Sequence, residues 1–230
     1  MKGVILSAGM GTRLHPLTIT TNKNLLPVYD KPLIEYPMKT LRDGGVDDIL
    51  LVSNREHIDQ FAKLFGSTVK YAIQENPKGG IADALKSAKG FVSKQESFVL
   101  ILADNIFEKG LDFSLKKDKK GKIFLKQVDD AFRFGVPEFN EEKEIISIIE
   151  KPEGATVGFA QTGAYMYRGE VFNILDKIKP SARGELEISD VNNYYAKLKV
   201  LDYEVIEGFW RDAGTFEALL ESSIWVSQQE

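Results

Sequence analysis

The sequence of 230 residues contains no cysteine and only two histidines, His15 and His57. Without cysteine the chain can form no disulfide, no thiolate nucleophile and no cysteine-ligated zinc or iron–sulfur site. The two histidines lie in different segments, which argues against a metal site built from several imidazole groups. Covalent cross-links and thiol chemistry are therefore excluded.

Long hydrophobic runs are also missing. The longest, from Phe98 to Ala103, is far shorter than the ~20 residues that a membrane-spanning helix needs. Residues Met1 to Leu6 lead directly into a glycine-containing loop, which leaves no room for the apolar region and cleavage site of a signal peptide. We therefore expect a cytoplasmic protein with no membrane partner.

Neither sign of charge is in large excess. The chain has 30 lysines and arginines against 34 aspartates and glutamates, which gives a net charge of −4. This balance argues against a nucleic-acid-binding surface. Because 43% of the residues are hydrophobic, the composition is that of an ordinary globular protein and excludes a disordered chain. Any positive charge that binds phosphate must be concentrated locally.

Short apolar runs alternate with amphipathic segments, a pattern that predicts an α/β fold with a largely parallel sheet. The first half contains four predicted strands, at Gly3–Ala8, Ile49–Ser53, Val69–Gln74 and Phe98–Leu102. Predicted helices lie between them, at Ile34–Arg42, Glu56–Phe65 and Ile81–Gly90. In the second of these helices the apolar residues recur at helical spacing.

The second half changes character, because several predicted strands follow one another with only turns between them. They lie at Lys122–Val128, Phe134–Phe139, Ile145–Glu150 and Gln161–Tyr167. This succession predicts antiparallel pairing or a small additional β subsheet. The remaining predicted elements are a strand at Val200–Glu207 and helices at Glu170–Ile178, Ile188–Lys197 and Thr215–Gln228.

A glycine loop with Gly9 and Gly11 follows the first predicted strand directly. Glycines let backbone N–H groups approach a ligand closely, and clusters of N–H groups favour phosphate oxygens. A dinucleotide-binding fingerprint would need a third glycine where Leu14 stands and an unbroken helix where Pro16 stands, so a nicotinamide-dependent oxidoreductase is disfavoured. A P-loop would need Gly-Lys-Ser/Thr, which the loop lacks.

Two basic residues lie near this loop. Arg13 is inside it, and Lys23 follows a short distance along the chain. A planar guanidinium group and a compact ammonium group together suit a triphosphate, which needs several donors. The loop and the two cations therefore predict a triphosphate site at the end of the first strand.

A series of motifs extends over nearly the whole chain. It begins with the run from Gly9 to Pro32 and continues with Ala103-Asp104-Asn105, Arg133-Phe134-Gly135-Val136, Glu150-Lys151-Pro152, Thr162-Gly163-Ala164-Tyr165, Arg183 to Asn192 and Trp210 to Thr215. In this order the motifs resemble those of the sugar-1-phosphate nucleotidyltransferases, and most of all the short-form glucose-1-phosphate thymidylyltransferases. Each motif alone is unspecific, whereas their joint order is specific.

The resemblance implies a three-layer Rossmann-like α/β domain with a mostly parallel mixed sheet and a small additional β subsheet. It implies that residues 1–230 form a single catalytic domain without the C-terminal helical extension of longer members. The implied enzyme is magnesium-dependent and transfers a nucleotidyl group from dTTP or UTP to a sugar 1-phosphate, glucose 1-phosphate in the first instance, with release of pyrophosphate. A homo-oligomer, dimer or tetramer, is also implied.

The resemblance assigns phosphate and metal binding to matching positions. Arg13 and Lys23 would hold the triphosphate, and Lys151 and Arg183 would hold the phosphate of the sugar. The magnesium ion would be bound by Asp104 and Asp212. These four cations, which the resemblance makes the catalytic residues, are expected to form a basic cleft in a protein that is acidic overall.

Nucleotide and sugar contacts are implied in the same way. The nucleotide would contact Leu6, Ala8, Gly9, Gly11, Thr12, Arg13, Gln74 and Gly80. The sugar would contact Gly135, Glu150 and Tyr165. The amide of Gln74 can pair with the imide edge of a pyrimidine through one donor and one acceptor, which favours thymine or uracil over guanine.

The implied reaction needs no general base. A phosphate monoester has a second pKa of about 6, so the attacking sugar phosphate is mostly anionic at neutral pH. The reaction instead requires charge neutralisation and alignment of two anions that repel each other. A sequence with only two histidines is consistent with this chemistry.

The chain departs from the family pattern at a few positions. Ser7-Ala8 stands where Ala-Gly is usual, Asp83 where Gln is usual, and Gln161 where an apolar residue near the sugar is usual. These departures concern the base and the sugar, so dTTP or UTP, and sugars other than glucose, stay open. A non-catalytic sugar-nucleotide-binding regulatory protein on the same fold is the alternative, although it would have no use for two metal-binding carboxylates.

Overall fold

The computed structural model describes residues 1–154 and 156–229. A seven-stranded sheet forms its centre, with the strand order β12-β8-β11-β6-β1-β4-β5. Four adjacent strands of this sheet run parallel, namely β6 (Ser97–Leu102), β1 (Lys2–Ser7), β4 (Asp48–Ser53) and β5 (Lys70–Ile73). They are the four strands predicted from the first half of the sequence.

The other half of the sheet contains an antiparallel strand. β11 (Gly158–Arg168) lies antiparallel between β6 and β8 (Gly121–Val128). β12 (Leu201–Val205) then runs parallel to β8 at the edge. The predicted mostly parallel mixed sheet is therefore confirmed, with β11 as its antiparallel member.

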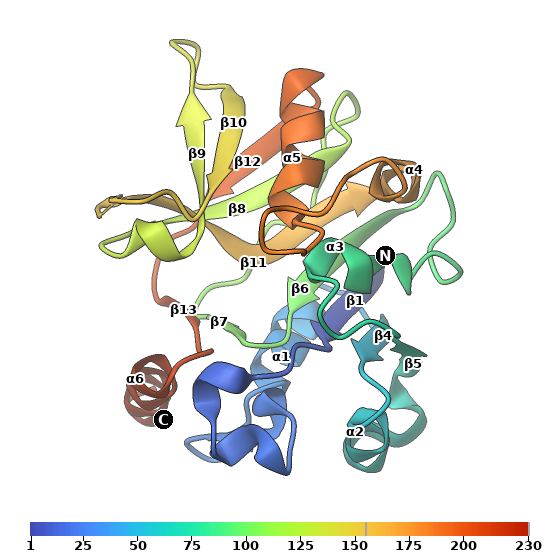
Figure 1. Cartoon of the computed structure of the whole chain (residues 1–230), viewed down its shortest axis with the longest axis vertical. Helices are drawn as coiled ribbons and strands as arrows, with labels where there is room; N and C mark the ends of the chain where they lie inside the picture. Colours follow the sequence, from blue (N-terminus) through green and yellow to red (C-terminus); the bar gives the residue numbers. More distant parts are fainter. Residues whose placement is uncertain (155, 230) are drawn as a thin grey trace.

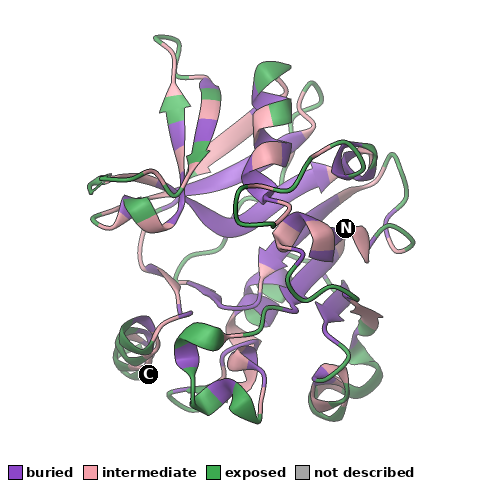
Figure 2. Cartoon of the chain, in the orientation of Figure 1, coloured by how far each residue is buried: buried purple, intermediate pink, exposed green. Residues whose placement is uncertain are grey.

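Helices cover both faces of the sheet (Figure 1). One face packs against α3 (Ile81–Lys86), α4 (Phe172–Leu175) and α5 (Ile188–Lys197). The opposite face packs against α1 (Glu35–Asp43) and α2 (Ile58–Phe65). Because successive side chains of a strand point to opposite faces, Val4 and Leu6 enter the first core and Ile5 the second. The three layers are confirmed, and Figure 2 shows the sheet buried between them.

Three small two-stranded sheets surround the main one. The hairpin of β9 (Gly135–Phe139) and β10 (Ile145–Glu150) is the predicted subsheet. The other two are β2 (Pro27–Val28) with β3 (Lys31–Pro32), and β7 (Asn105–Phe107) with β13 (Trp210–Asp212). Their strands have two or three residues, too few to show the period-2 pattern by which a strand is recognised.

Helix lengths differ from prediction in two places. α3 ends at Lys86 instead of continuing to Gly90, and the Ser87 hydroxyl donates to the Ile73 carbonyl oxygen at 3.1 Å. A serine that bonds to other backbone groups competes with helix continuation. The predicted helix Glu170–Ile178 is a 3₁₀ turn followed by the four-residue α4. The last helix, α6 (Phe216–Ser227), begins one residue later than predicted, after the capping residue Thr215, whose side chain accepts from Ala218 N–H.

The parallel strands bring several predicted functional residues to one edge. β1 and β6 are neighbours in register, so their carboxyl ends, Ser7 and Leu102, lie at the same level of the sheet. Gln74 follows β5 and donates its N–H to the Ser53 carbonyl oxygen at 2.8 Å, which fixes it at the end of β4. The carboxyl edge of such a sheet is where ligands bind. No helix of the described residues is long and apolar enough to cross a bilayer.

Candidate active site

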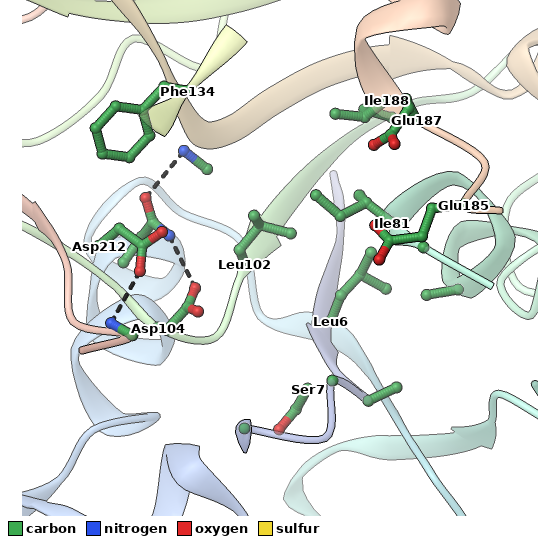
Figure 3. Close-up of a pocket in the computed structure, with 18 of the residues that line it drawn as sticks. Leu6, Ser7, Ile81, Leu102, Asp104, Phe134, Glu185, Glu187, Ile188 and Asp212 are labelled. Atoms are coloured by element: carbon green, nitrogen blue, oxygen red, sulfur yellow. Dashed lines mark hydrogen bonds between the residues drawn. The ribbon is translucent and has the colours of Figure 1, made fainter. Parts of the chain in front are cut away.

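A cleft of about 520 Å³ opens at the carboxyl edge of the sheet. All sixteen residues to which the sequence assigned a role line it. In Figure 3 Asp104 and Asp212 lie on one side and Glu185 and Glu187 on the other, with Leu102 and other apolar side chains between them. The cleft thus has two polar sides separated by an apolar floor.

A buried network at the end of β1 positions Lys23. The flanking residue Asn22 donates from Nδ2 to the Ser7 carbonyl oxygen at 2.9 Å, and Asn24 donates from Nδ2 to Ser7 Oγ at 2.7 Å. Asn22 Oδ1 also accepts from Asn24 N–H at 2.9 Å and caps the 3₁₀ turn that carries Lys23. Ser7, one of the departures from the family pattern, therefore anchors this loop.

Short strand pairing brings the two aspartates together. β7 and β13 pair so that Asn105 is opposite Asp212, and Ala213 N–H donates to the Asp104 carbonyl oxygen at 2.8 Å. Lys23 Nζ donates to Asp104 Oδ2 in a largely buried ion pair. Asp212 Oδ1 accepts from Gly214 N–H at 2.9 Å (Figure 3). We call Asp104 and Asp212 the carboxylate pair.

Burial and charge act in opposite directions on these groups. Burial favours the neutral form of Lys23, but the charges of Asp104 and Asp212 and the hydrogen bond to Asp104 outweigh it and raise its pKa. Burial also opposes ionisation of Asp104, yet Lys23 overcomes it and lowers the pKa of Asp104. For Asp212, burial and the charge of Asp104 prevail over the nearby cations and raise its pKa. A further cation would therefore be favoured beside Asp212.

The chemistry of the carboxylate pair fits magnesium. Among the described residues no group of three or more histidine, cysteine, aspartate and glutamate side chains could hold a metal ion. Two carboxylates alone are the protein contribution that magnesium usually has, because it keeps water and substrate phosphates as its other ligands. The two carboxylates, one buried and one half-buried, lie in or directly before paired strands beside the same cleft, and this donor set makes a cation suitable here.

A cluster of charged side chains forms the opposite side of the cleft; we call it the Arg183 cluster. Its members are Glu150, Lys151, Arg183, Glu185 and Glu187. Arg183 NH2 contacts Glu187 Oε1 at 2.8 Å and Glu150 Oε1 at 3.5 Å. Although partial burial acts to lower the pKa of Arg183, the hydrogen bond to Glu187 and the surrounding glutamates raise it. The guanidinium group is therefore held in place before any ligand arrives.

Lys151 has an unusual backbone. It follows the last residue of β10 with φ of 49°, and its N–H donates to the Phe134 carbonyl oxygen at 2.9 Å. Non-glycine residues in the left-handed region are uncommon and concentrate at functional sites. Its ammonium group lies 3.7 Å from Glu150 Oε1, so the strained backbone directs this lysine to the Arg183 cluster.

Gln74 forms the end of the cleft beside α3. Its Nε2 donates to Asp83 Oδ2 at 2.9 Å and to the Gly80 carbonyl oxygen at 3.3 Å. The amine is thus occupied, and Oε1 is the atom left to accept a hydrogen bond from a ligand. Gly80 has φ of 86°, and a Cβ there would lie 2.7 Å from the Leu186 carbonyl oxygen. Close packing against Leu186 therefore requires glycine at position 80.

The expectation of a basic cleft needs correction. Six cationic and five acidic side chains line the cleft, so its formal charge is close to zero. Of the four cations expected to bind phosphate, Lys23, Lys151 and Arg183 each contact a carboxylate. Lys23 is largely buried and therefore needs a partner, and the sequence could not reveal that the distant Asp104 would provide it.

The sequence profile of the nucleotidyl transferase family matches residues 2–229. The chain belongs to this family. It is 40% identical to a glucose-1-phosphate thymidylyltransferase from Neisseria meningitidis over 239 aligned positions, which cover 98% of this chain and 82% of that protein. A protein of the same name from Mycobacterium tuberculosis is 38% identical, with 100% of this chain and 83% of that protein covered.

Solved structures of nucleotidyl transferases share the fold. A crystal structure from Bacillus anthracis, provisionally named a glucose-1-phosphate thymidylyltransferase and determined with sucrose, has a TM-score of 0.90 and 40% identity, covering 98% of this chain and 94% of that one. A UDP-glucose pyrophosphorylase in complex with UDP-glucose has a TM-score of 0.85 and 25% identity, covering 100% and 99% of the two chains. The predicted family and fold are confirmed.

Asn105 is a residue of this nucleotidyl transferase that sequence reasoning did not select. Its Nδ2 donates to Asp104 Oδ1 at 3.0 Å, and its Oδ1 accepts from Gly163 N–H at 2.9 Å and Trp210 Nε1 at 2.8 Å. One buried side chain therefore joins β7, β11 and β13 and orients Asp104 of the carboxylate pair. Its place directly after Asp104 in the motif was the available signal.

The substitution Gly163→Ala tests this support. A Cβ at residue 163 would lie 2.4 Å from Asn105 Nδ2, so Asn105 would have to move. We expect the free energy of unfolding, measured by urea denaturation, to fall by about 1–3 kcal/mol. Gly158→Ala in the same strand is the control, because its Cβ would meet Ala131 Cβ at an ordinary 3.5 Å. Equal stability of the two variants would contradict the role given to Asn105.

Proposed function

We propose that this nucleotidyl transferase transfers a nucleotidyl group from dTTP or UTP to a sugar 1-phosphate, with glucose 1-phosphate as the first candidate, and releases pyrophosphate. The observation that carries the proposal is the division of one cleft into two cationic sides, with the carboxylate pair beside one of them. Two mutually repelling phosphate groups could be held there in line for reaction.

The triphosphate would lie at the carboxyl edge of β1. The glycine loop offers backbone N–H groups, and Arg13 and Lys23 would neutralise the triphosphate and the departing pyrophosphate. Asp104 and Asp212 would hold a magnesium ion at this side. When bound, such an ion neutralises charge on the phosphate oxygens as a Lewis acid. Lys23 would exchange part of its contact with Asp104 for contact with phosphate.

The sugar 1-phosphate would lie against the Arg183 cluster. Lys151 and Arg183 would bind its phosphate, while Glu150 would accept hydrogen bonds from sugar hydroxyls. Tyr165 is fully buried, and its burial together with the charge of Glu150 raises its pKa well above the ordinary tyrosine value. Its hydroxyl therefore stays protonated at working pH and is suited to hydrogen bonding with the sugar.

The attacking group needs no base from the protein. A phosphate monoester with a second pKa of about 6 is already an anion at neutral pH. In agreement, no histidine is found among the described residues that line the cleft. The side chains would bind, align and neutralise, and the phosphate oxygen of the sugar would attack the α-phosphorus as pyrophosphate leaves.

Gln74 supports a pyrimidine base. Because Asp83 and Gly80 occupy its amine, the carbonyl oxygen would accept from the imide N–H of thymine or uracil. We expected Gln74 to pair with the base through both its N–H and its carbonyl oxygen. With the N–H groups occupied, one hydrogen bond, to the carbonyl oxygen, is left. The 5-methyl group and the absent 2′-hydroxyl that separate dTTP from UTP are left to be tested directly.

A screen of pyrophosphate release tests the proposal. It crosses glucose, galactose, mannose and N-acetylglucosamine 1-phosphates with dTTP, UTP, GTP, ATP and CTP in the presence of magnesium. We expect the highest rates with dTTP or UTP and with one of the sugar phosphates. Release from no combination would contradict the enzyme activity and favour the regulatory alternative.

Two further features of the chain stay proposals. We propose that residues 1–230 act as one catalytic domain, because segments from Leu6 to Gly214 line the same cleft. The expected homo-oligomer, dimer or tetramer, is a prediction that sedimentation equilibrium of the purified chain would decide.

Asp104→Asn removes one charge of the carboxylate pair with little change in shape. We expect kcat/KM to fall about 100-fold or more, because electrostatic stabilisation at the reacting phosphates is lost, and higher magnesium concentrations to be needed for half-maximal rate. The control is Asp118→Asn at an exposed turn, which should leave the rate unchanged. Near-normal turnover of the Asp104 variant would exclude its assigned role.

Lys151→Ala separates the two phosphate sites. Loss of a charged partner of the sugar phosphate should raise the KM for sugar 1-phosphate about 10-fold or more, while the KM for the triphosphate should change less than about 3-fold. Initial rates with one substrate varied at a time provide the measurement. Lys63→Ala on the exposed part of α2 is the control. An equal effect on both KM values would show that Lys151 does not distinguish the substrates.

A further inference from the structure

Gln161 is a buried polar residue in the cleft that the proposed mechanism does not use. It comes from β11, is 5% exposed and lines the cleft. A Cβ on Gly135 would lie 3.2 Å from its Nε2 and 3.0 Å from Ser189 Oγ. Gln161 thus borders the part of the cleft that Gly135, Glu150 and Tyr165 are expected to offer to the sugar.

A chain of buried hydrogen bonds fixes one end of this amide. Asn192 donates from Nδ2 to Gln161 Oε1 at 2.7 Å, and the Tyr167 hydroxyl donates to Asn192 Oδ1 at 2.6 Å. Tyr167 and Asn192 are both fully buried. The carbonyl oxygen of Gln161 is therefore directed into the protein and is already satisfied.

Ser189 independently determines which end of the Gln161 amide is the nitrogen, the end that also lies beside the cleft-lining Tyr165. Its hydroxyl donates to Glu150 Oε2 at 2.6 Å. A hydroxyl has a single proton, so Ser189 Oγ can only accept from Gln161. The atom of Gln161 that faces Ser189 must therefore be the amine nitrogen, whichever way an isolated amide would be assigned.

This amine nitrogen is poorly satisfied by the protein. Its contacts are Ser189 Oγ at 3.4 Å and the Tyr165 hydroxyl at 3.5 Å, both at the long limit of a hydrogen bond. A buried donor without a good acceptor is unfavourable. Because Gln161 lines the cleft, a ligand bound there could provide the missing acceptor for Nε2 with one of its oxygens.

We propose that Gln161 determines sugar specificity by donating a hydrogen bond from Nε2 to a hydroxyl oxygen of the sugar 1-phosphate. The inference rests on the proposed function and deepens it. An apolar side chain at this position would not distinguish a sugar carbon that carries a hydroxyl from one that carries only hydrogen. A fixed amide donor favours the carbon that carries the hydroxyl, because it needs an oxygen as acceptor. The preferred substrate is then a hydroxylated hexose 1-phosphate, and the analogue that is deoxygenated at the contacted carbon is rejected.

The test compares wild type and Gln161→Met, which keeps the side-chain length and removes the donor. Values of kcat/KM are measured for glucose 1-phosphate and its 2-, 3-, 4- and 6-deoxy analogues. We expect wild type to discriminate against one analogue at least about 10-fold more strongly than Gln161→Met does. That analogue identifies the contacted hydroxyl. A loss of the same size for all five substrates would overturn the inference and leave Gln161 a structural residue.

Two further variants serve as a control and as a replacement for Gln161→Met. Gln127→Met makes the same substitution at an exposed position of β8 outside the cleft and should leave all five values unchanged. If Gln161→Met does not fold, as judged by thermal unfolding, Gln161→Glu takes its place. It is isosteric, replaces the donor with an acceptor, and should lose the same selective discrimination; uniform loss again overturns the inference.

Failure of the proposed function gives a different result. If wild type binds the sugar phosphates in calorimetry but releases no pyrophosphate with any triphosphate, catalysis is overturned. The Gln161 inference is then decided by the Kd values of the same five compounds for both variants, with the same pattern expected. If wild type binds none of them, the function and the inference fail together.

Discussion

The burial of a lysine and two aspartates at the end of the central strands is the constraint on which the rest of the site depends. Removing three charged groups from water is unfavourable unless they face one another with fixed geometry. The Lys23–Asp104 ion pair meets this need for two of them. Asp212 is left with a raised pKa, so the site is stable as a protein structure yet incomplete in charge.

Much of the surrounding structure holds these groups in position. Ser7 and the asparagines on either side of Lys23 fix the lysine from β1. Asn105 of β7 bonds to Asp104 and is itself held by residues of β11 and β13. Both networks use neutral amide and hydroxyl groups, which are easier to bury than charges when they are hydrogen-bonded. Most of their polar atoms are, with Asn24 Oδ1 as an exception. The charged groups therefore need little rearrangement among themselves, and preorganisation of this kind is what phosphoryl transfer requires of a protein.

The sequence was sufficient for features that depend on local pattern or on the order of motifs. The strands of the parallel half follow from short apolar runs, and the residues of the cleft follow from motifs in family order. It was insufficient where partners come from distant segments. The three-residue strands β7 and β13 have no recognisable period. Of the acids beside Arg183, Glu187 is only four residues away, but Glu150 belongs to the distant strand β10. Gly80, which is expected to contact the nucleotide, lines the cleft, and its close packing against Leu186 is a second requirement for glycine that the sequence did not show.

The near-neutral charge of the cleft changes how selectivity should be understood. Both cations of the Arg183 cluster that we propose to bind phosphate are already beside a glutamate, so a phosphate gains contact only by sharing one of them. The cleft therefore attracts anions only weakly, and binding of a phosphate depends on hydrogen-bond donors that are correctly placed. Glu150 links the two tasks, because one of its oxygens lies near Arg183 and the other accepts from Ser189. Ser189 in turn orients the amine of Gln161. The phosphate-binding cation and the proposed sugar-reading donor are thus joined through a single carboxylate, which couples recognition of the sugar to the position of its phosphate.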